Sequence, residues 1–362
     1  MKRLNYITAD EWWDTDVTIL DDLAKHFDLY VYVLSPAPKR SKYAVKHLDS
    51  CKNLYNCIYH FRKRNPLCAI FMIYFFVKVC IAGNKKNVVN FCMFGWHPFL
   101  RPFFLYLFPR TNTIISFHNY KSHVKLKNDP TLPFYKRFKY FHFHSRMQMD
   151  LYLKDYHNGN VFYTQMLPKD FGNPQGNYRL DKNGKRIFLF FGLIRDYKRL
   201  DLLINAINQI ESDNILVVIA GYCGDFSQYN KMIADKNKFR CDIRLINNSE
   251  IADLFTISDF LVLPYDDATQ SGPSLIALNY GLPIIASDLP AFKELISPGE
   301  TGFLFKRGDQ SSLSGIIKNT LEMSDIQVEN MKKNQLLKKS KYVVDNQPYV
   351  GFLDFINNVM DI

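Results

Sequence analysis

The chain has 362 residues with a formal net charge of +11, and 47% of its residues are hydrophobic and 15% aromatic. This composition excludes intrinsic disorder, and the length is typical of two domains. The seven cysteines include no Cys-x-x-Cys pair, which argues against a disulfide framework and against a zinc site. The start, MKRLNYITADEWW, lacks the apolar run of a signal peptide, so we expect a cytoplasmic protein.

Strands in the first half are expected at 4–9, 29–35, 87–94 and 113–117, with helices at 15–27 and 67–82. This alternation is typical of a parallel sheet with crossover helices. The helix at 67–82 is interrupted by Lys78 and is shorter than the roughly 20 residues that span a bilayer, so we expect it to be buried or interfacial.

Positive charge is concentrated in this first half. Residues 1–170 contain 25 Lys and Arg against 12 Asp and Glu, whereas the remainder contains 21 against 23. Such a surface suits an anionic partner, namely a membrane with acidic lipids, a pyrophosphate-bearing acceptor or a nucleic acid. A merely solvated basic face is the alternative.

Residues 172–184 are rich in Gly, Pro and Asn, and we interpret them as a linker. Beyond it, strands are expected at 186–194, 214–221, 241–246, 259–264 and 283–286, and helices at 198–210, 249–258, 273–280 and 349–360. We therefore predict an α/β protein with two Rossmann-like doubly wound parallel-sheet domains facing a cleft. The first domain comprises residues 1–171 and the second residues 185–340. Residues 341–362 are expected to form a C-terminal helix that packs back on the first domain. Ligands are expected at the carboxyl ends of the strands.

Two features follow expected strand ends in the second half. In SGPSLIALNYG, Ser271 and Gly272 suit a helix cap, Pro273 the first helical position and Gly281 a left-handed stop, and such a helix start can bind an anion. In GLIRDYK, Arg195 and Lys198 precede a helix whose dipole disfavours cations. An anion between them would remove that conflict; exposed cations without a ligand are the alternative.

These residues resemble a known family. FGLIRDYKRLDLLINA resembles the donor-phosphate loop of GT-B glycosyltransferases, particularly glycosyltransferase family 4, and SGPSLIALNYGLPIIASDLPAFKELI with GETGFLF resembles that family's donor-binding stretch. The resemblance covers about residues 186–310. It implies a nucleotide-sugar donor in the second domain, with Arg195 and Lys198 neutralising the diphosphate. The donor-binding residues that it implies are Gly192, Gly221, Tyr222, Ser271, Gly272, Pro273, Ser274 and Glu294, although Glu294 could also simply face solvent.

One departure from the family is clear. Many members carry two glutamates eight positions apart in this stretch, where this chain has Ala268 and Ile276. Asp266 and Asp267 either substitute for them or form a turn. We interpret the chain as a divergent branch that has Ser-Gly here, rather than as a protein that has lost catalysis.

The first half offers further candidates. His118 weakly matches the histidine that the family places near the donor sugar, and a structural histidine is equally compatible. Trp96 and His97 follow an expected strand, where Trp96 either stacks on a sugar or packs. Asp14 and Asp16 are candidate acceptor contacts or bases, with helix capping as the alternative for Asp14.

The resulting expectation is a cytoplasmic glycosyltransferase, peripheral to the inner face of the cell membrane. It would transfer a sugar, with retention, from a nucleoside diphosphate sugar to a saccharide acceptor, lipid-linked in surface polysaccharide assembly. No cofactor, metal or nucleic acid is expected. A catalytically silent sugar-nucleotide-binding partner subunit, or a basic membrane or nucleic-acid binder, are the alternatives. Substitution of Arg195 and Lys198 distinguishes them.

Overall fold

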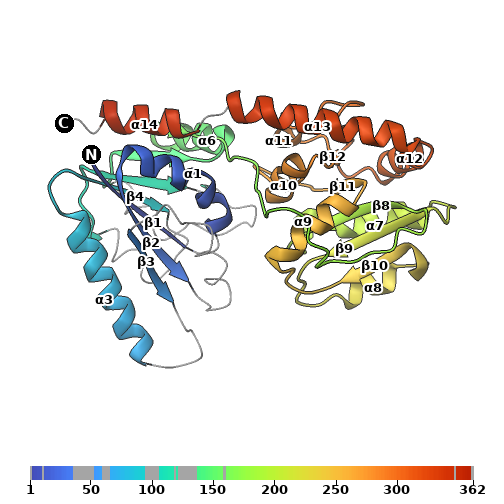
Figure 1. Cartoon of the computed structure of the whole chain (residues 1–362), viewed down its shortest axis with the longest axis horizontal. Helices are drawn as coiled ribbons and strands as arrows, with labels where there is room; N and C mark the ends of the chain where they lie inside the picture. Colours follow the sequence, from blue (N-terminus) through green and yellow to red (C-terminus); the bar gives the residue numbers. More distant parts are fainter. Residues whose placement is uncertain are drawn as a thin grey trace. The chain divides into compact units, whose positions relative to one another are not determined.

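The computed structural model describes residues 2–9, 12–35, 53–58, 66–93, 106–117, 120, 137–157, 160–345 and 348–359. The chain forms two compact units, each built on a parallel sheet (Figure 1). The first unit comprises Met1–Leu167 and Asn346–Ile362, and the second Pro168–Asp345. The predicted α/β class with two doubly wound sheets is confirmed.

The first unit is built on a seven-stranded sheet with the order β3-β2-β1-β4-β5-β6-β7, and all its strand pairs are parallel. Its elements in chain order are β1 (Arg3–Ala9), α1 (Trp13–His26), β2 (Asp28–Ser35), β3 (Asn53–Ile58), α3 (Pro66–Gly83), β4 (Val88–Met93), β5 (Thr113–Phe117), β6 (Tyr140–Phe143), α6 (Arg146–Tyr156), β7 (Val161–Tyr163) and α14 (Pro348–Val359).

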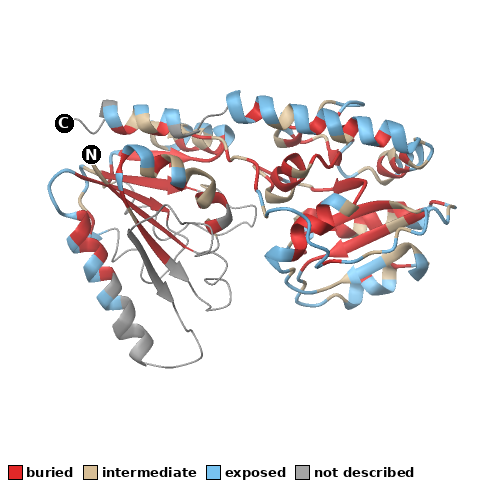
Figure 2. Ribbon diagram, viewed as in Figure 1, coloured by how far each residue is buried: buried red, intermediate tan, exposed pale blue. Residues whose placement is uncertain are grey.

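Helices cover both faces of this sheet. Successive side chains of a strand point to opposite faces, so each strand contributes to two core clusters. Leu4 and Tyr6 of β1 belong to a core cluster with α1 and with Phe352 and Ile356 of α14. Ile7 of the same strand belongs to a second cluster with α3 and α6. The central strands β1, β4, β5 and β6 are buried along nearly all of their lengths, whereas the helices alternate between buried and exposed residues (Figure 2). The C-terminal helix is therefore part of the first unit's core.

The second unit contains a six-stranded parallel sheet with the order β10-β9-β8-β11-β12-β13. Its elements in chain order are β8 (Arg186–Phe191), η2 (Asp196–Lys198), α7 (Leu200–Asn208), β9 (Ile215–Ala220), α8 (Ser227–Met232), η3 (Lys236–Lys238), β10 (Phe239–Asp242), α9 (Asn248–Ile257), β11 (Phe260–Leu263), α10 (Gly272–Tyr280), β12 (Ile284–Ser287), α11 (Pro290–Lys293), β13 (Gly302–Phe305), α12 (Gln310–Leu321) and α13 (Asp325–Asp345).

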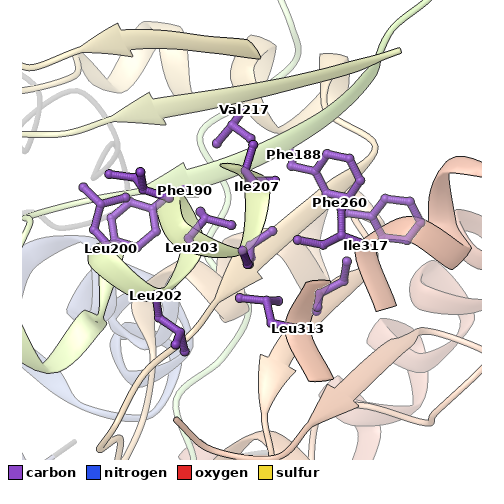
Figure 3. Close-up of a cluster of buried hydrophobic side chains, with 14 of the residues drawn as sticks. Phe188, Phe190, Leu200, Leu202, Leu203, Ile207, Val217, Phe260, Leu313 and Ile317 are labelled. Carbon is purple, nitrogen blue, oxygen red and sulfur yellow. The ribbon is translucent and has the colours of Figure 1, made fainter. Parts of the chain in front are cut away.

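One face of this sheet packs against α7 and α12. Phe188 of β8 and Phe260 of β11 stack with ring centroids 5.7 Å apart, and they share a buried cluster with Leu203 of α7 and Ile317 of α12 (Figure 3). Phe191, on the opposite face, meets Phe255 of α9 edge-on at 5.1 Å. Burial on both faces fixes the strand register, and with it the positions of the loops that leave the strand ends.

The segment that we predicted as a linker belongs to the second unit. Asp253 of α9 is buried, and its carboxylate accepts hydrogen bonds from the backbone N–H groups of Gln175, Gly176 and Tyr178 at 2.7–3.0 Å. Burial by itself raises the pKa of Asp253, but these bonds outweigh it and hold the pKa below its ordinary value. A Gly, Pro and Asn-rich composition indicated an irregular segment correctly, yet it carried no sign of the distant carboxylate that anchors it.

Replacing Asp253 by alanine should destabilise the second unit by about 3 kcal/mol, because three backbone N–H groups, one of them on the buried Tyr178, lose a charged acceptor. Urea unfolding measures the change. Asp213→Ala removes an exposed aspartate of the same unit and serves as the control, with a change below about 0.5 kcal/mol. Equal stability of the two variants would contradict the anchoring role.

Candidate phosphate site at a strand switch point

The direction of strand addition reverses between β8 and β11, which are neighbours in the sheet of the second unit. From β8 the chain continues to β9 on one side, and from β11 it continues to β12 on the other. Loops at such a point diverge and leave room for a ligand outside the carboxyl ends of the strands. Here these loops are residues 192–199 after β8 and 264–271 after β11.

The two loops are bound to one another. The backbone N–H of Asp266 donates to the carbonyl of Tyr197 at 2.8 Å, and the rings of Tyr197 and Tyr265 meet edge-on at 5.8 Å. Arg199, which has a left-handed backbone conformation with φ of 50°, spans the loops with its guanidinium. The positions of the charged groups in both loops therefore depend on each other.

Two of the predicted donor residues, Gly192 and Gly221, hold the first loop in place. A Cβ atom on Gly221 would lie 1.9 Å from the Gly192 carbonyl oxygen, so only glycine fits there. Gly192 has φ of 100°, and its N–H donates to Ala220 at 2.9 Å, while Ile194 donates to the carbonyl of Tyr222 at 2.9 Å. The exposed Tyr222 side chain stays a predicted contact for the donor base.

The three cations of the first loop differ in whether a carboxylate neutralises them. Arg199 pairs with the carboxylates of Asp201 and Asp266, with all hydrogen bonds between 2.9 and 3.1 Å, and it is thereby neutralised. Arg195 is exposed and Lys198 is buried, and neither side chain makes a hydrogen bond or ion pair with any residue that the structure describes. Arg195 and Lys198, the two predicted phosphate-binding residues, are therefore the cations of this loop whose charge is not neutralised by a described carboxylate.

Lys198 lies in an unusual environment for an ammonium group, since its side chain is only 7% exposed. Its Nζ atom is 3.2 Å from the point where a Cβ atom on Gly192 would lie, and the ring of Tyr265 is 5.4 Å away. Burial, and secondarily the charge of Arg195, lower the pKa of Lys198 to about 8. A buried cation without a counterion is costly, so a bound anion would stabilise this arrangement.

The start of α10 supplies the remaining part of the site. Ser271 is the N-cap, and its Oγ accepts a 3.4 Å hydrogen bond from the N–H of Ser274, whose own hydroxyl donates back to the Ser271 carbonyl at 2.7 Å. Both serine hydroxyls therefore serve the cap. The N–H groups of Ser271 and Gly272 donate to no acceptor among the described residues, and they are available to an anion.

The helix itself differs from its prediction by one residue. Gly272 is the first helical residue and Pro273 the second, and Gly281 ends the helix with φ of 69° as expected. Pro273 Cγ lies 3.8 Å from the point where a Cβ atom on Gly192 would lie, the point that Lys198 Nζ also approaches. The helix start and the loop cations thus converge on one region.

Other predicted residues of the second unit lie apart from this region or have other partners. Asp266 is bound to Arg199, so it is not free to replace a missing glutamate. Ala268 and Ile276, at the two glutamate positions, are buried. Glu294 is exposed at the C-terminal end of α11 and remains a predicted ribose contact.

In the first unit, His118, Trp96 and His97 lie outside the described residues. Asp14 is the second residue of α1, whose N-cap is Trp12, so the capping alternative is wrong. The Asp16 carboxylate is 1% exposed and accepts hydrogen bonds from Tyr6 Oη at 2.8 Å and Thr8 Oγ1 at 2.5 Å. It is an internal anchor between β1 and α1, and its role as an acceptor contact stays a prediction.

A buried polar chain in the first unit was not predicted. His142 of β6 lies between Ser116 Oγ, at 2.8 Å from its Nδ1, and Thr164 Oγ1, at 2.7 Å from its Nε2. Burial and the neighbouring His144 hold the pKa of His142 well below its ordinary value. The histidine is therefore neutral, and it connects β5 and β6 to Thr164, the residue that follows β7. Residues so far apart in sequence gave no signal of this contact.

Within the described part of the chain, no cluster of three or more His, Cys, Asp or Glu residues is arranged to hold a metal ion. Among the same residues, no helix has both the length and the hydrophobicity that crossing a bilayer requires.

Comparison with known proteins agrees with this geometry. Residues 178–337 match the model of the family "Glycosyl transferases group 1", a match that covers most of the second unit. A search of curated proteins finds no relative.

Solved structures of similar fold include HepE from Anabaena in complex with UDP (12% identity, 97% of this chain and 99% of that one, TM-score 0.69). Others are a glycosyltransferase from Rickettsia africae (12%, 100% of both chains, 0.73) and sucrose-phosphate synthase from Thermosynechococcus elongatus (14%, 98% of both, 0.67). The likeness establishes the shared two-domain GT-B fold.

Proposed function

We propose that this chain, whose residues 178–337 match the model of the family "Glycosyl transferases group 1", is a glycosyltransferase that uses a nucleoside diphosphate sugar as donor. The observation that carries the proposal is Lys198, a buried ammonium group without a counterion among the described residues, beside Arg195 and the start of α10. A diphosphate supplies two adjacent anionic groups, which suits two cations and the N–H groups of Ser271 and Gly272.

The chemistry follows from where charge develops. The bond between the sugar C1 atom and the diphosphate oxygen breaks, a new bond forms between C1 and an acceptor oxygen, and the proton of the acceptor hydroxyl passes to the leaving diphosphate. Negative charge grows on the leaving diphosphate, so cations and N–H groups fixed around it stabilise the transition state more than the ground state. The chain's own charges therefore supply the main catalytic effect, and we expect turnover to survive EDTA.

The comparisons support the nature of the donor. The HepE structures contain UDP, UDP-glucose, or UDP with glucose, and a structure of S. aureus TarM contains UDP. We further propose that the chain is a divergent branch of family 4 that transfers with retention, in which Ser271 and Gly272 stand in a stretch where many members carry glutamate. Arg195 and Lys198, which have no partner among the described residues, support binding of a donor diphosphate, and turnover distinguishes an active enzyme from a silent partner subunit.

The experiment is a thermal-shift panel of UDP, GDP, ADP and their sugar conjugates, followed by a donor-hydrolysis assay with the series that stabilises the protein. Stabilisation by one nucleotide series together with slow hydrolysis supports the enzyme. Stabilisation without turnover on any acceptor would favour the silent partner subunit. If no member stabilises the protein at millimolar concentration, the proposed donor site is wrong.

We also propose that the first unit binds the inner face of the cell membrane, where a lipid-linked saccharide of surface polysaccharide assembly would be the acceptor. Ile73, Val77 and Ile81 of α3 are 60%, 47% and 62% exposed, and their spacing of four residues places them on one face of the helix. Lys78, Lys85 and Lys86, within or just after this helix, are exposed. Apolar insertion combined with basic charge suits anionic lipids.

The double substitution Ile73→Glu, Ile81→Glu should lower binding to phosphatidylserine vesicles more than tenfold, because it removes apolar burial worth roughly 1.5–3 kcal/mol per side chain. Vesicle sedimentation measures the binding, and raising the salt concentration should weaken binding of the unmodified protein. Ile326→Glu, at an isoleucine of α13 that is 74% exposed, is the control. Unchanged vesicle binding by the double variant would exclude this face.

A further inference from the structure

A buried tyrosine hydroxyl beside the candidate phosphate site has no hydrogen-bond partner. Tyr265, the second residue after β11, is 2% exposed, and its Oη atom makes no hydrogen bond with any described residue. Within the described residues of the second unit, the one other buried side-chain atom in this condition is Gln335 Oε1, and the amide nitrogen of Gln335 still donates to the carbonyl of Leu282 at 3.5 Å. Tyr265 leaves its whole side-chain polar group unpaired, which destabilises the ligand-free protein.

Packing fixes the position of Tyr265. Its backbone carbonyl accepts a 2.6 Å hydrogen bond from Ser287 Oγ at the end of β12. Its ring meets the rings of Tyr197 and Phe292 edge-on, with centroids 5.8 and 5.7 Å away. Because these neighbours are packed against the ring, the hydroxyl cannot turn toward bulk water without disturbing them. The unpaired hydroxyl is therefore a property of the fold.

The Tyr265 side chain lies within the candidate phosphate site. Lys198 Nζ is 5.4 Å from the centre of its ring. The side chain of Ser271 lies close enough to the hydroxyl to lower the pKa of Tyr265 in part, although no hydrogen bond joins the two residues. Ser271 is the N-cap of α10, the helix start at which the N–H groups of Ser271 and Gly272 have no acceptor among the described residues. The tyrosine thus connects the buried ammonium group with the helix start.

The groups left unpaired here are all hydrogen-bond donors. Burial, and secondarily Tyr197, raise the pKa of Tyr265 above its ordinary value despite the opposing effect of Ser271, so the hydroxyl keeps its proton. The Lys198 ammonium group and the two N–H groups are donors as well. A ligand that satisfies them must supply several acceptors close together, and the oxygens of a phosphate group do so while also carrying the negative charge that Lys198 requires.

We propose that the Tyr265 hydroxyl donates a hydrogen bond to a phosphate oxygen of the bound nucleoside diphosphate, beside Lys198. The inference rests on the proposed function and adds an uncharged donor to the site. Because the hydroxyl binds the phosphates, its loss should affect a nucleoside diphosphate and the corresponding nucleotide sugar alike.

The test uses the full chain and isothermal titration with UDP, GDP, ADP and their sugar conjugates. Tyr265→Phe removes one oxygen atom and keeps the ring, and it should weaken binding of the diphosphate and of its sugar conjugate about ten- to a hundredfold each. The melting temperature of ligand-free Tyr265→Phe should be equal to or higher than that of the unmodified protein, because no hydrogen bond is lost. A purely structural hydroxyl would give the reverse, a lower melting temperature with unchanged affinity.

Tyr280→Phe is the matched control. The hydroxyl of Tyr280, the last residue of α10, accepts a 2.8 Å hydrogen bond from the N–H of Phe171 and donates to the carbonyl of Gly172 at 2.9 Å. Because this hydroxyl has partners within the protein, its removal should lower the melting temperature and leave nucleotide affinity unchanged.

Three outcomes would contradict the inference. Unchanged diphosphate affinity in Tyr265→Phe, while Lys198→Met loses affinity, would overturn it and leave the proposed function intact. A loss confined to the sugar conjugate would also overturn it, because the hydroxyl would then bind the sugar. If the unmodified protein binds none of these nucleotides, both the inference and the proposed function are wrong.

Discussion

Replacing Lys198 by methionine is expected to lower kcat/KM about a hundred- to a thousandfold. Lys198 is a buried cation without a counterion among the described residues, so its interaction with a diphosphate replaces no existing ion pair. Because the lysine is buried, water screens this interaction little. Arg195→Ala should show a smaller loss, because the exposed guanidinium interacts through screening water. The double variant should lose measurable donor binding.

Initial rates of donor hydrolysis and titration with the nucleoside diphosphate measure both effects. Lys306→Ala controls for a general loss of positive charge. Arg199→Ala gives an informative contrast, because Arg199 is already bound to Asp201 and Asp266. Its loss should lower the melting temperature, whereas Lys198→Met should not. If Lys198→Met has wild-type kcat/KM, the phosphate site is assigned to the wrong residues.

Donor affinity should fall about tenfold for each pH unit above 8. Burial, with a smaller contribution from Arg195, lowers the pKa of Lys198 in the free protein to about 8, and a bound diphosphate must raise that pKa because it favours the ammonium form. Between pH 7 and 8 the lysine is already largely charged, so the affinity changes little. Above pH 8 binding requires uptake of a proton, which costs affinity. The terminal phosphate is fully ionised throughout this range, since its pKa is about 6.

Titration calorimetry at pH 9 in two buffers of different ionisation enthalpy measures the proton uptake, which should approach one per diphosphate bound. Lys198→Arg should show a flat affinity from pH 7 to 10, because the guanidinium stays charged. A flat profile for the unmodified protein would refute the role of Lys198 titration.

Stability of the ligand-free protein should change in the opposite direction. The folded-state pKa of Lys198 lies below that of the unfolded chain, so the unfolded state binds more protons between pH 8 and about 10.4. The contribution of Lys198 to stability therefore rises with pH across this window, by roughly 3 kcal/mol in total. Opposite pH trends of stability and donor affinity, both absent in Lys198→Met, would identify this one group.

Hydrophobic periodicity was sufficient to predict the parallel architecture and most elements. The strand that begins at Arg186 and the helix that ends at Gly281 follow from local patterns, because strands buried on both faces require continuous apolar runs and helix ends require particular backbone conformations. Short strands were missed at 53–58, 140–143, 161–163 and 302–305, and β10 begins at Phe239 rather than at residue 241. Such short segments are stabilised by neighbouring strands more than by their own residues.

The sequence by itself determined that cations follow the strand ending at Phe191 and that a capped helix start follows the strand ending at Leu263, since both are local patterns. Only the tertiary structure decided which cations are available. Arg199 is neutralised by Asp266, 67 residues away, whereas Lys198 meets no carboxylate of the described chain. Electrostatic pairing depends on distance in space and on burial, and both arise only when the strand order brings separate loops together.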